Sequence, residues 1–87
     1  MNTPHIDPPE DDGWQCTTWM RGNIGHGVHV NLMTGHNLRT ERVDPPALLI
    51  DGPDGSVELQ SREQLDALLA ALGDAARLWD ALTAPPA

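Results

Sequence analysis

Three side-chain types are missing from this 87-residue chain: lysine, phenylalanine and tyrosine. No ammonium group is available to bind a phosphate, and Trp14, Trp19 and Trp79 are the only aromatic side chains. The 13 acidic residues outnumber the five arginines, which gives a formal net charge of −8. The negative electrostatic potential of such a chain repels nucleic acids and anionic membranes and favours basic or neutral partners. We therefore expect neither direct nucleic-acid binding nor membrane binding.

Cysteine and long apolar runs are also scarce. Cys16 is the single cysteine, so no disulfide can form within the chain. No apolar stretch approaches the ~20 residues that a membrane-spanning helix needs. Residues 1–13 lack the basic start and apolar core of a signal peptide, so we expect a cytoplasmic protein.

The chain has the length of one domain. Residues 1–13 contain three prolines and four acidic residues, which predicts a flexible acidic arm. Residues 14–84 are expected to form a single α+β domain, and residues 85–87 a tail.

Alternating polar and apolar residues predict strands at 14–21 and 26–33, each followed by a turn at 22–25 and 34–37. Residues 39–42 are polar, and the pattern leaves open whether 38–43 form an exposed edge strand. Pro45 and Pro46 should end that segment, because neither can donate to a ladder. Two short apolar runs at 47–50 and 57–60 flank a dense turn signal, which predicts a β-hairpin.

The C-terminal part predicts one amphipathic helix. Ser61 and Gln64 have the spacing of a capping box at its start. Gly73 could break the helix in two, but the apolar stripe keeps its phase across it and favours one helix. The stripe consists of Leu65, Leu68, Leu69, Leu72, Ala75, Ala76, Trp79 and Leu82.

These elements predict an α+β fold with two layers: an antiparallel β-meander of four to five strands packed on one long C-terminal helix. The residues expected to face the helix are Val28, Val30, Leu32, Leu48, Ile50, Val57 and Leu59. A single helix covers only part of such a sheet. Trp19 and Met33 are expected on the uncovered face, where a homodimer would bury them.

A metal site is the first chemical possibility, with Cys16, His26, His29 and His36 as candidate ligands. Zinc needs three or four such ligands converging on one point. In a strand, His26 and His29 would point to opposite faces. We therefore expect no bound metal, and a metal-binding domain remains an alternative.

Catalytic chemistry has little support in the sequence. Asp51, Asp54 and Glu58 surround the predicted hairpin turn, where aspartates usually cap backbone donors. No phosphate-binding glycine loop, nucleophile elbow or zinc-protease motif is present. We expect no catalytic residues, no cofactor and no enzymatic activity.

A resemblance concerns the segment Cys16-Thr17-Thr18-Trp19, the following His26-Gly27, the strand-like run 54–59 and the alanine- and leucine-rich helix. Together these resemble small acidic actinobacterial and actinophage proteins of unknown function. Members often carry Cys-Pro-x-Trp-Cys before a histidine, whereas this chain lacks that proline and the second cysteine. The resemblance implies an actinobacterial or bacteriophage gene, and a phage protein would act in the host cytoplasm.

The expected function is that of a small non-enzymatic interaction protein, which binds a host protein or itself through the uncovered sheet face, the helix or both. Trp19, Met33, Leu78 and Trp79 are the predicted partner-binding residues. The alternative is a DNA mimic that inhibits a nucleic-acid-binding protein with carboxylates in phosphate-like rows. Binding by such a mimic would depend strongly on salt.

Overall fold

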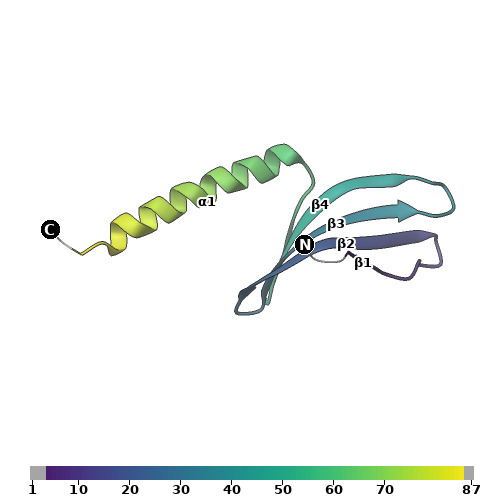
Figure 1. Cartoon of the computed structure of the whole chain (residues 1–87), viewed down its shortest axis with the longest axis horizontal. Coiled ribbons are helices and arrows are strands. Elements are labelled where there is room, and N and C mark those ends of the chain that lie inside the picture. The colour runs from purple at the N-terminus through teal and green to yellow at the C-terminus, as the bar shows by residue number, and fades with distance from the viewer. Residues whose placement is uncertain (1–3, 86–87) are drawn as a thin grey trace.

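The computed structural model describes residues 4–85, so residues 1–3 of the predicted arm and residues 86–87 of the predicted tail lie outside the described part. Figure 1 shows an antiparallel sheet followed by one long helix. The α+β class and the order of a meander followed by a helix are therefore confirmed. The elements are β1 (His5–Ile6), β2 (Trp14–Gly25), β3 (Val28–Asn37), β4 (Val43–Gly52), β5 (Gly55–Leu59) and α1 (Arg62–Thr83).

The first long hairpin turns at His26 and Gly27. Both residues have positive φ values, 55° and 76°, which suits the two-residue turns that match the twist of paired strands. The predicted turn at 22–25 is wrong, because those residues continue β2. Their turn-like composition instead accompanies an irregularity in the ladder between Asn23 and Gly25, where the Asn23 side chain accepts the Gly25 N–H at 2.9 Å.

The second hairpin turns at 38–40 rather than at the predicted 34–37, which lie in β3. Asn37 fixes this turn, because its Oδ1 accepts the N–H groups of Arg39 at 2.9 Å and Thr40 at 3.1 Å. The question left open for 38–43 is thereby answered: the segment is a turn, and only its last residue, Val43, belongs to a strand.

β4 passes through the two prolines that were expected to end the segment. Gly35 pairs with Asp44 and Met33 with Ala47, so Pro45 and Pro46 lie opposite the single residue between those partners. This bulge removes the need for the two missing N–H donors on the β3 side. On the other side β5 pairs with β4 only from Leu48 onward, so no ladder bond is lost there.

The predicted hairpin of β4 and β5 is confirmed, and its register aligns the apolar side chains. Residues paired across neighbouring strands share a face. Val30 pairs with Ile50 and Ile50 with Val57, while Leu32 pairs with Leu48 and Leu48 with Leu59. With Val28, which alternates in phase with Val30, these residues form what we call the apolar sheet face.

Helix α1 is one continuous helix through Gly73, as the phase of its stripe predicted. Ser61 caps it, with its Oγ accepting the Gln64 N–H at 3.1 Å. The Gln64 side chain reaches back and accepts the Gln60 N–H at 2.9 Å. This reciprocal pair fixes the short connection between β5 and α1.

The contact between the two layers is confined to the first turn of α1. Leu65 lies beside Leu32, Leu48 and Leu59, and the rest of the helix runs away from the sheet (Figure 1). The molecule is accordingly long, with extents of 64 × 28 × 26 Å and a radius of gyration of 17.2 Å. A compact domain of this length has a radius of gyration of about 12 Å. Most of the apolar sheet face is therefore left without the cover expected from α1.

Residues 4–13, expected to form a flexible arm, lie against the sheet. His5 and Ile6 pair with Thr18 and Thr17 as the edge strand β1. Further along, the Asp7 N–H donates to the Cys16 carbonyl at 3.0 Å, and the Glu10 N–H donates to the Trp14 carbonyl at 2.8 Å. The prolines leave this segment irregular, but the backbone donors between them still find partners on β2.

Candidate protein-interaction interface

The described part of the chain has large exposed hydrophobic side chains and no buried ones. Among residues 4–85 no hydrophobic residue is buried. The accessible surface is 7003 Å², whereas a compact monomer of this mass exposes about 5,000 Å². The exposed large side chains are Ile6, Trp19, Met20, Ile24, Leu38, Val43, Val57, Leu69, Leu72, Leu78, Trp79 and Leu82. Such a surface is typical of a protein that is completed by a partner.

The first apolar surface is the helix stripe, which consists of Leu65, Leu68, Leu69, Leu72, Trp79 and Leu82 with Ala75 and Ala76 between them. Its members recur on one side of α1 because of the 3.6-residue period. Exposure increases along the helix, from 55% at Leu72 to 71% at Trp79 and 77% at Leu82. The stripe is therefore covered by its own chain only at its beginning.

Charged residues line one border of the helix stripe in alternating sign: Arg62, Asp66, Arg77 and Asp80. Within the chain Arg62 pairs with Asp66 at 2.9 Å, and Arg77 pairs with Asp74. The paired side chains are more than half exposed, so these ion pairs add little to the stability of the monomer. They remain free to exchange partners in a complex.

The second apolar surface is the apolar sheet face. Its side chains are half-buried across β3 and β4, and Val57 on the outer strand is 58% exposed. The indole Nε1 of Trp19 donates to Thr34 Oγ1 at 2.8 Å. Because Thr34 alternates in phase with Leu32, this bond holds the Trp19 ring on the apolar side. Trp19 therefore widens this surface toward β2.

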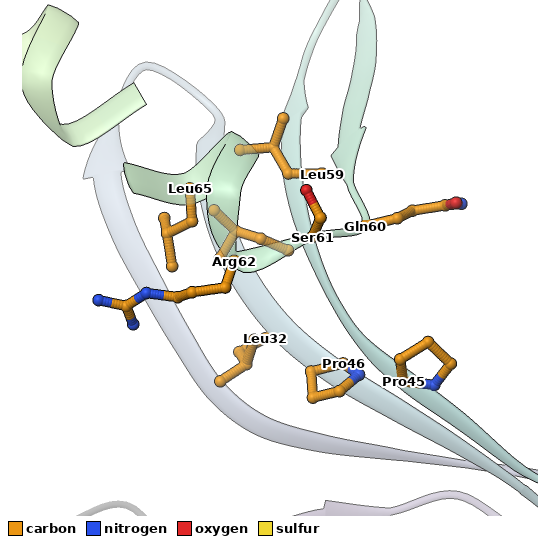
Figure 2. A pocket seen from close by; sticks show the side chains of 9 residues that line it. Leu32, Pro45, Pro46, Leu59, Gln60, Ser61, Arg62 and Leu65 are labelled. Atoms are coloured by element: carbon orange, nitrogen blue, oxygen red, sulfur yellow. The ribbon is translucent and has the colours of Figure 1, made fainter. Parts of the chain in front are cut away.

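A pocket joins the two surfaces where the helix leaves the sheet. It has a volume of about 350 Å³ and a largely apolar lining from β3, β4, the end of β5, the connection and the first helical turn. Figure 2 shows Leu65, Leu59 and Leu32 around it, with Pro45 and Pro46 at one side. Its volume is at the lower end of the range for ligand pockets and could hold one large side chain of a partner.

The four predicted partner-binding residues do not form one site. Trp19 lies on the apolar sheet face, whereas Met33, which pairs with Thr18 and Ala47, is half-buried on the opposite face. Leu78 and Trp79 are exposed near the C-terminal end of α1. The sequence predicted Trp19 and Met33 together on the face away from the helix, whereas Trp19 lies with the residues expected to face the helix. It also missed the pocket, which depends on where the helix begins relative to Pro45 and Pro46.

The sheet face opposite the apolar sheet face carries two buried polar groups, at Asn31 and His29, that the sequence pattern did not predict. Asn31 is 8% exposed, and its Nδ2 donates to Asp51 Oδ2 at 3.2 Å. Asn31 Oδ1 and His29 Nδ1 have no hydrogen-bond partner among the described residues. Unsatisfied buried groups cost stability.

The candidate metal ligands are not brought together. Among the described residues no three His, Cys, Asp or Glu side chains are close enough to hold a metal ion. Cys16 pairs with Gly35, so the neighbouring His36 points to the other face of the sheet. Burial raises the pKa of the Cys16 thiol, and the carboxylates of Asp7 and Glu10 raise it further. A raised pKa disfavours the thiolate that metal binding and nucleophilic attack require.

The one helix of residues 4–85 is not apolar enough over a membrane-length span to cross a bilayer. No protein family matches the chain, and the comparisons found no similar curated protein and no similar solved structure.

Proposed function

We propose that this chain is a non-enzymatic interaction protein that presents the helix stripe and the apolar sheet face to other protein surfaces. One observation carries the proposal: no hydrophobic side chain is buried among residues 4–85, while large ones are exposed on both surfaces. Contiguous exposed apolar surface of this extent is characteristic of binding sites. The exposed tryptophans, Trp19 and Trp79, supply the kind of side chain that dominates binding energy at interfaces.

The charge of the chain favours a protein as the partner over a lipid or nucleic-acid surface. Helices that lie on membranes usually carry basic residues on their polar face. Helix α1 carries four acidic residues, Glu63, Asp66, Asp74 and Asp80, against two arginines. The net charge of −8 has the same unfavourable sign toward phosphates. We place the interaction in a cytoplasm, and in a host cytoplasm if the resemblance to actinophage proteins holds.

The proposal is tested by affinity capture from an actinobacterial lysate, with captured proteins identified by mass spectrometry. Trp19→Ala and Val57→Asp alter the apolar sheet face at side chains that are about half exposed or more, so neither should unfold the chain. Ser56→Asp is the matched control, because it adds the same charge on the opposite face of β5. A partner retained by the wild type and the control but lost by both sheet-face variants supports the proposal.

Two other results point elsewhere. Capture of a nucleic-acid enzyme that disappears with added salt, and that both sheet-face variants retain, supports the DNA-mimic alternative. A compact monomer that captures nothing contradicts the proposal, because such a chain would have covered its own apolar surfaces.

A further inference from the structure

We infer that the helix stripe is covered by a second copy of this chain, with the two α1 helices packed antiparallel about a two-fold axis close to Leu72. The inference rests on the proposed function, since it names the partner for one of its two surfaces. It leaves the apolar sheet face to another protein. Three features of the described residues support it: the composition of the stripe, the order of the charges beside it and the surplus surface.

The stripe is nearly symmetric about Leu72. Leu65 and Trp79 are equally spaced on either side of it, as are Leu68 and Ala76, and all lie on the same side of the helix. When two such helices run in opposite directions with Leu72 at the centre, the partner's Trp79 lies opposite Leu65. Large residues at the ends of the contact meet leucines, and the smaller alanines allow close approach between them.

The charges beside the stripe select the antiparallel direction. Arg62 and Asp80 are about five whole turns apart, so they project at the same angle, and Asp66 and Arg77 lie close to the same line. Along the helix these charges run plus, minus, plus, minus. The same series read from the other end has the opposite sign at every place. An antiparallel pair centred on Leu72 therefore places Arg62 within two residues, about 3 Å along the axis, of the level of the partner's Asp80, and Asp66 within one residue of the level of the partner's Arg77. In a parallel pair related by a two-fold axis, the charged borders of the two helices would lie on opposite sides of the interface, so these charges could not pair.

The surplus surface is large enough for a stable dimer. The chain exposes 7003 Å², about 2,000 Å² more than a compact monomer of its mass. Stable interfaces bury about 1,200–2,000 Å² counted over both partners. Burying less than half of the surplus on each chain reaches that range. The paired helices would contact each other over about 27 Å between Arg62 and Asp80.

In this arrangement the partner's Trp79 would fill the pocket at the start of α1. Leu65 lines it, and the antiparallel alignment brings the partner's Trp79 to Leu65. The indole is 71% exposed on its own chain, and the pocket of about 350 Å³ has space for it. By symmetry each chain would supply one tryptophan and one pocket.

Cysteine cross-linking tests the direction of the helices. In a Cys16→Ser background, one chain carries Arg62→Cys and another carries Asp80→Cys; both positions are exposed, so neither change should unfold the chain. Each variant chain then carries a single cysteine, so every disulfide that forms joins two chains. After mixing under mild oxidation, we expect a disulfide between the two different variants as the main product. Any other result, whether self-linked chains of one variant as the main product or no disulfide between the two variants, would mean that the helices do not pair antiparallel in this register and would overturn the inference.

The mass of the wild-type chain in solution separates this inference from the proposed function. We expect twice the 9.4 kDa chain mass by light scattering. A monomer that still captures a protein through Trp19 overturns the second copy as partner and leaves the proposed function standing. A monomer that captures nothing, with a radius of gyration near about 12 Å, overturns both.

Discussion

Asn37 is the residue on which the turn between β3 and β4 depends. It is 5% exposed, and its side chain accepts two N–H groups of the turn while its Nδ2 donates to the Asp12 carbonyl at 3.4 Å. Its backbone N–H also donates to the Arg42 carbonyl, which closes the turn. One polar side chain thus organises a turn and ties the N-terminal segment to it.

Replacing Asn37 with alanine should therefore destabilise the fold by about 1–3 kcal/mol, because three part-buried backbone groups lose their hydrogen-bond partner. Asn37→Asp retains the acceptor for Arg39 and Thr40 and should cost less. Urea denaturation followed by tryptophan fluorescence measures both. Equal losses for the two variants would mean that the acceptor role assigned to Oδ1 is wrong.

The raised pKa of the Cys16 thiol can be tested through the pH dependence of its reactivity. Its pKa lies above the ordinary value of 9.0 because of burial and, secondarily, the charges of Asp7 and Glu10. Near pH 8–9 the folded chain should thus be alkylated by iodoacetamide more slowly than the same chain in urea. A thiol that ionises less readily in the folded state also favours unfolding as pH rises through 9.0 toward the raised folded pKa. Equal alkylation rates in the folded and unfolded chain would contradict the raised pKa.

At the scale of elements, the sequence predicts what its periodicity determines directly. The helix bounds, its continuity through Gly73 and the β4–β5 hairpin follow from the capping residues, the spacing of leucines and a dense turn signal. The two longer hairpins are less predictable. Gly22-Asn23 and Thr34-Gly35 have the composition of turns, but the strands continue through them because the ladder tolerates bulges there.

The turn at His26 shows why the positions of the two longer hairpin turns could not be predicted from the sequence. A φ of 55° is uncommon for any residue except glycine, and histidine indicates such a turn less strongly than asparagine or aspartate does. His26→Asn places the preferred residue before Gly27 and should stabilise the hairpin by about 0.5–1 kcal/mol. The increase should appear in thermal denaturation, with His36→Asn as a control in strand β3. No gain over the control would mean that the turn adopts another conformation.

The candidate interface could be predicted from the sequence only in part. Hydrophobic periodicity identifies an apolar stripe on α1 and an apolar face on the sheet, but it does not specify what covers them. The expected answer was that each covers the other within one chain. In the structure they meet only around Leu65, because the capped connection at Gln60 and Ser61 directs α1 away from β3 and β4.

At the scale of the whole molecule, the central feature is an extended chain with no buried hydrophobic residue among those described. Burial of apolar surface supplies most of the favourable free energy of folding. A chain of this shape gains more of that free energy when another surface covers its stripe. Association and stability should therefore depend on each other, so that the melting temperature rises with protein concentration.

The most direct test is sedimentation equilibrium on the wild type and two charge variants of α1. Leu72→Asp places two carboxylates at the two-fold axis, whereas Ala70→Asp adds the same charge on the opposite side of the helix. We predict twice the 9.4 kDa chain mass for the wild type and Ala70→Asp and the single chain mass for Leu72→Asp. A wild-type monomer, or a Leu72→Asp variant that sediments as a dimer, would contradict the claim that a second copy covers the helix stripe.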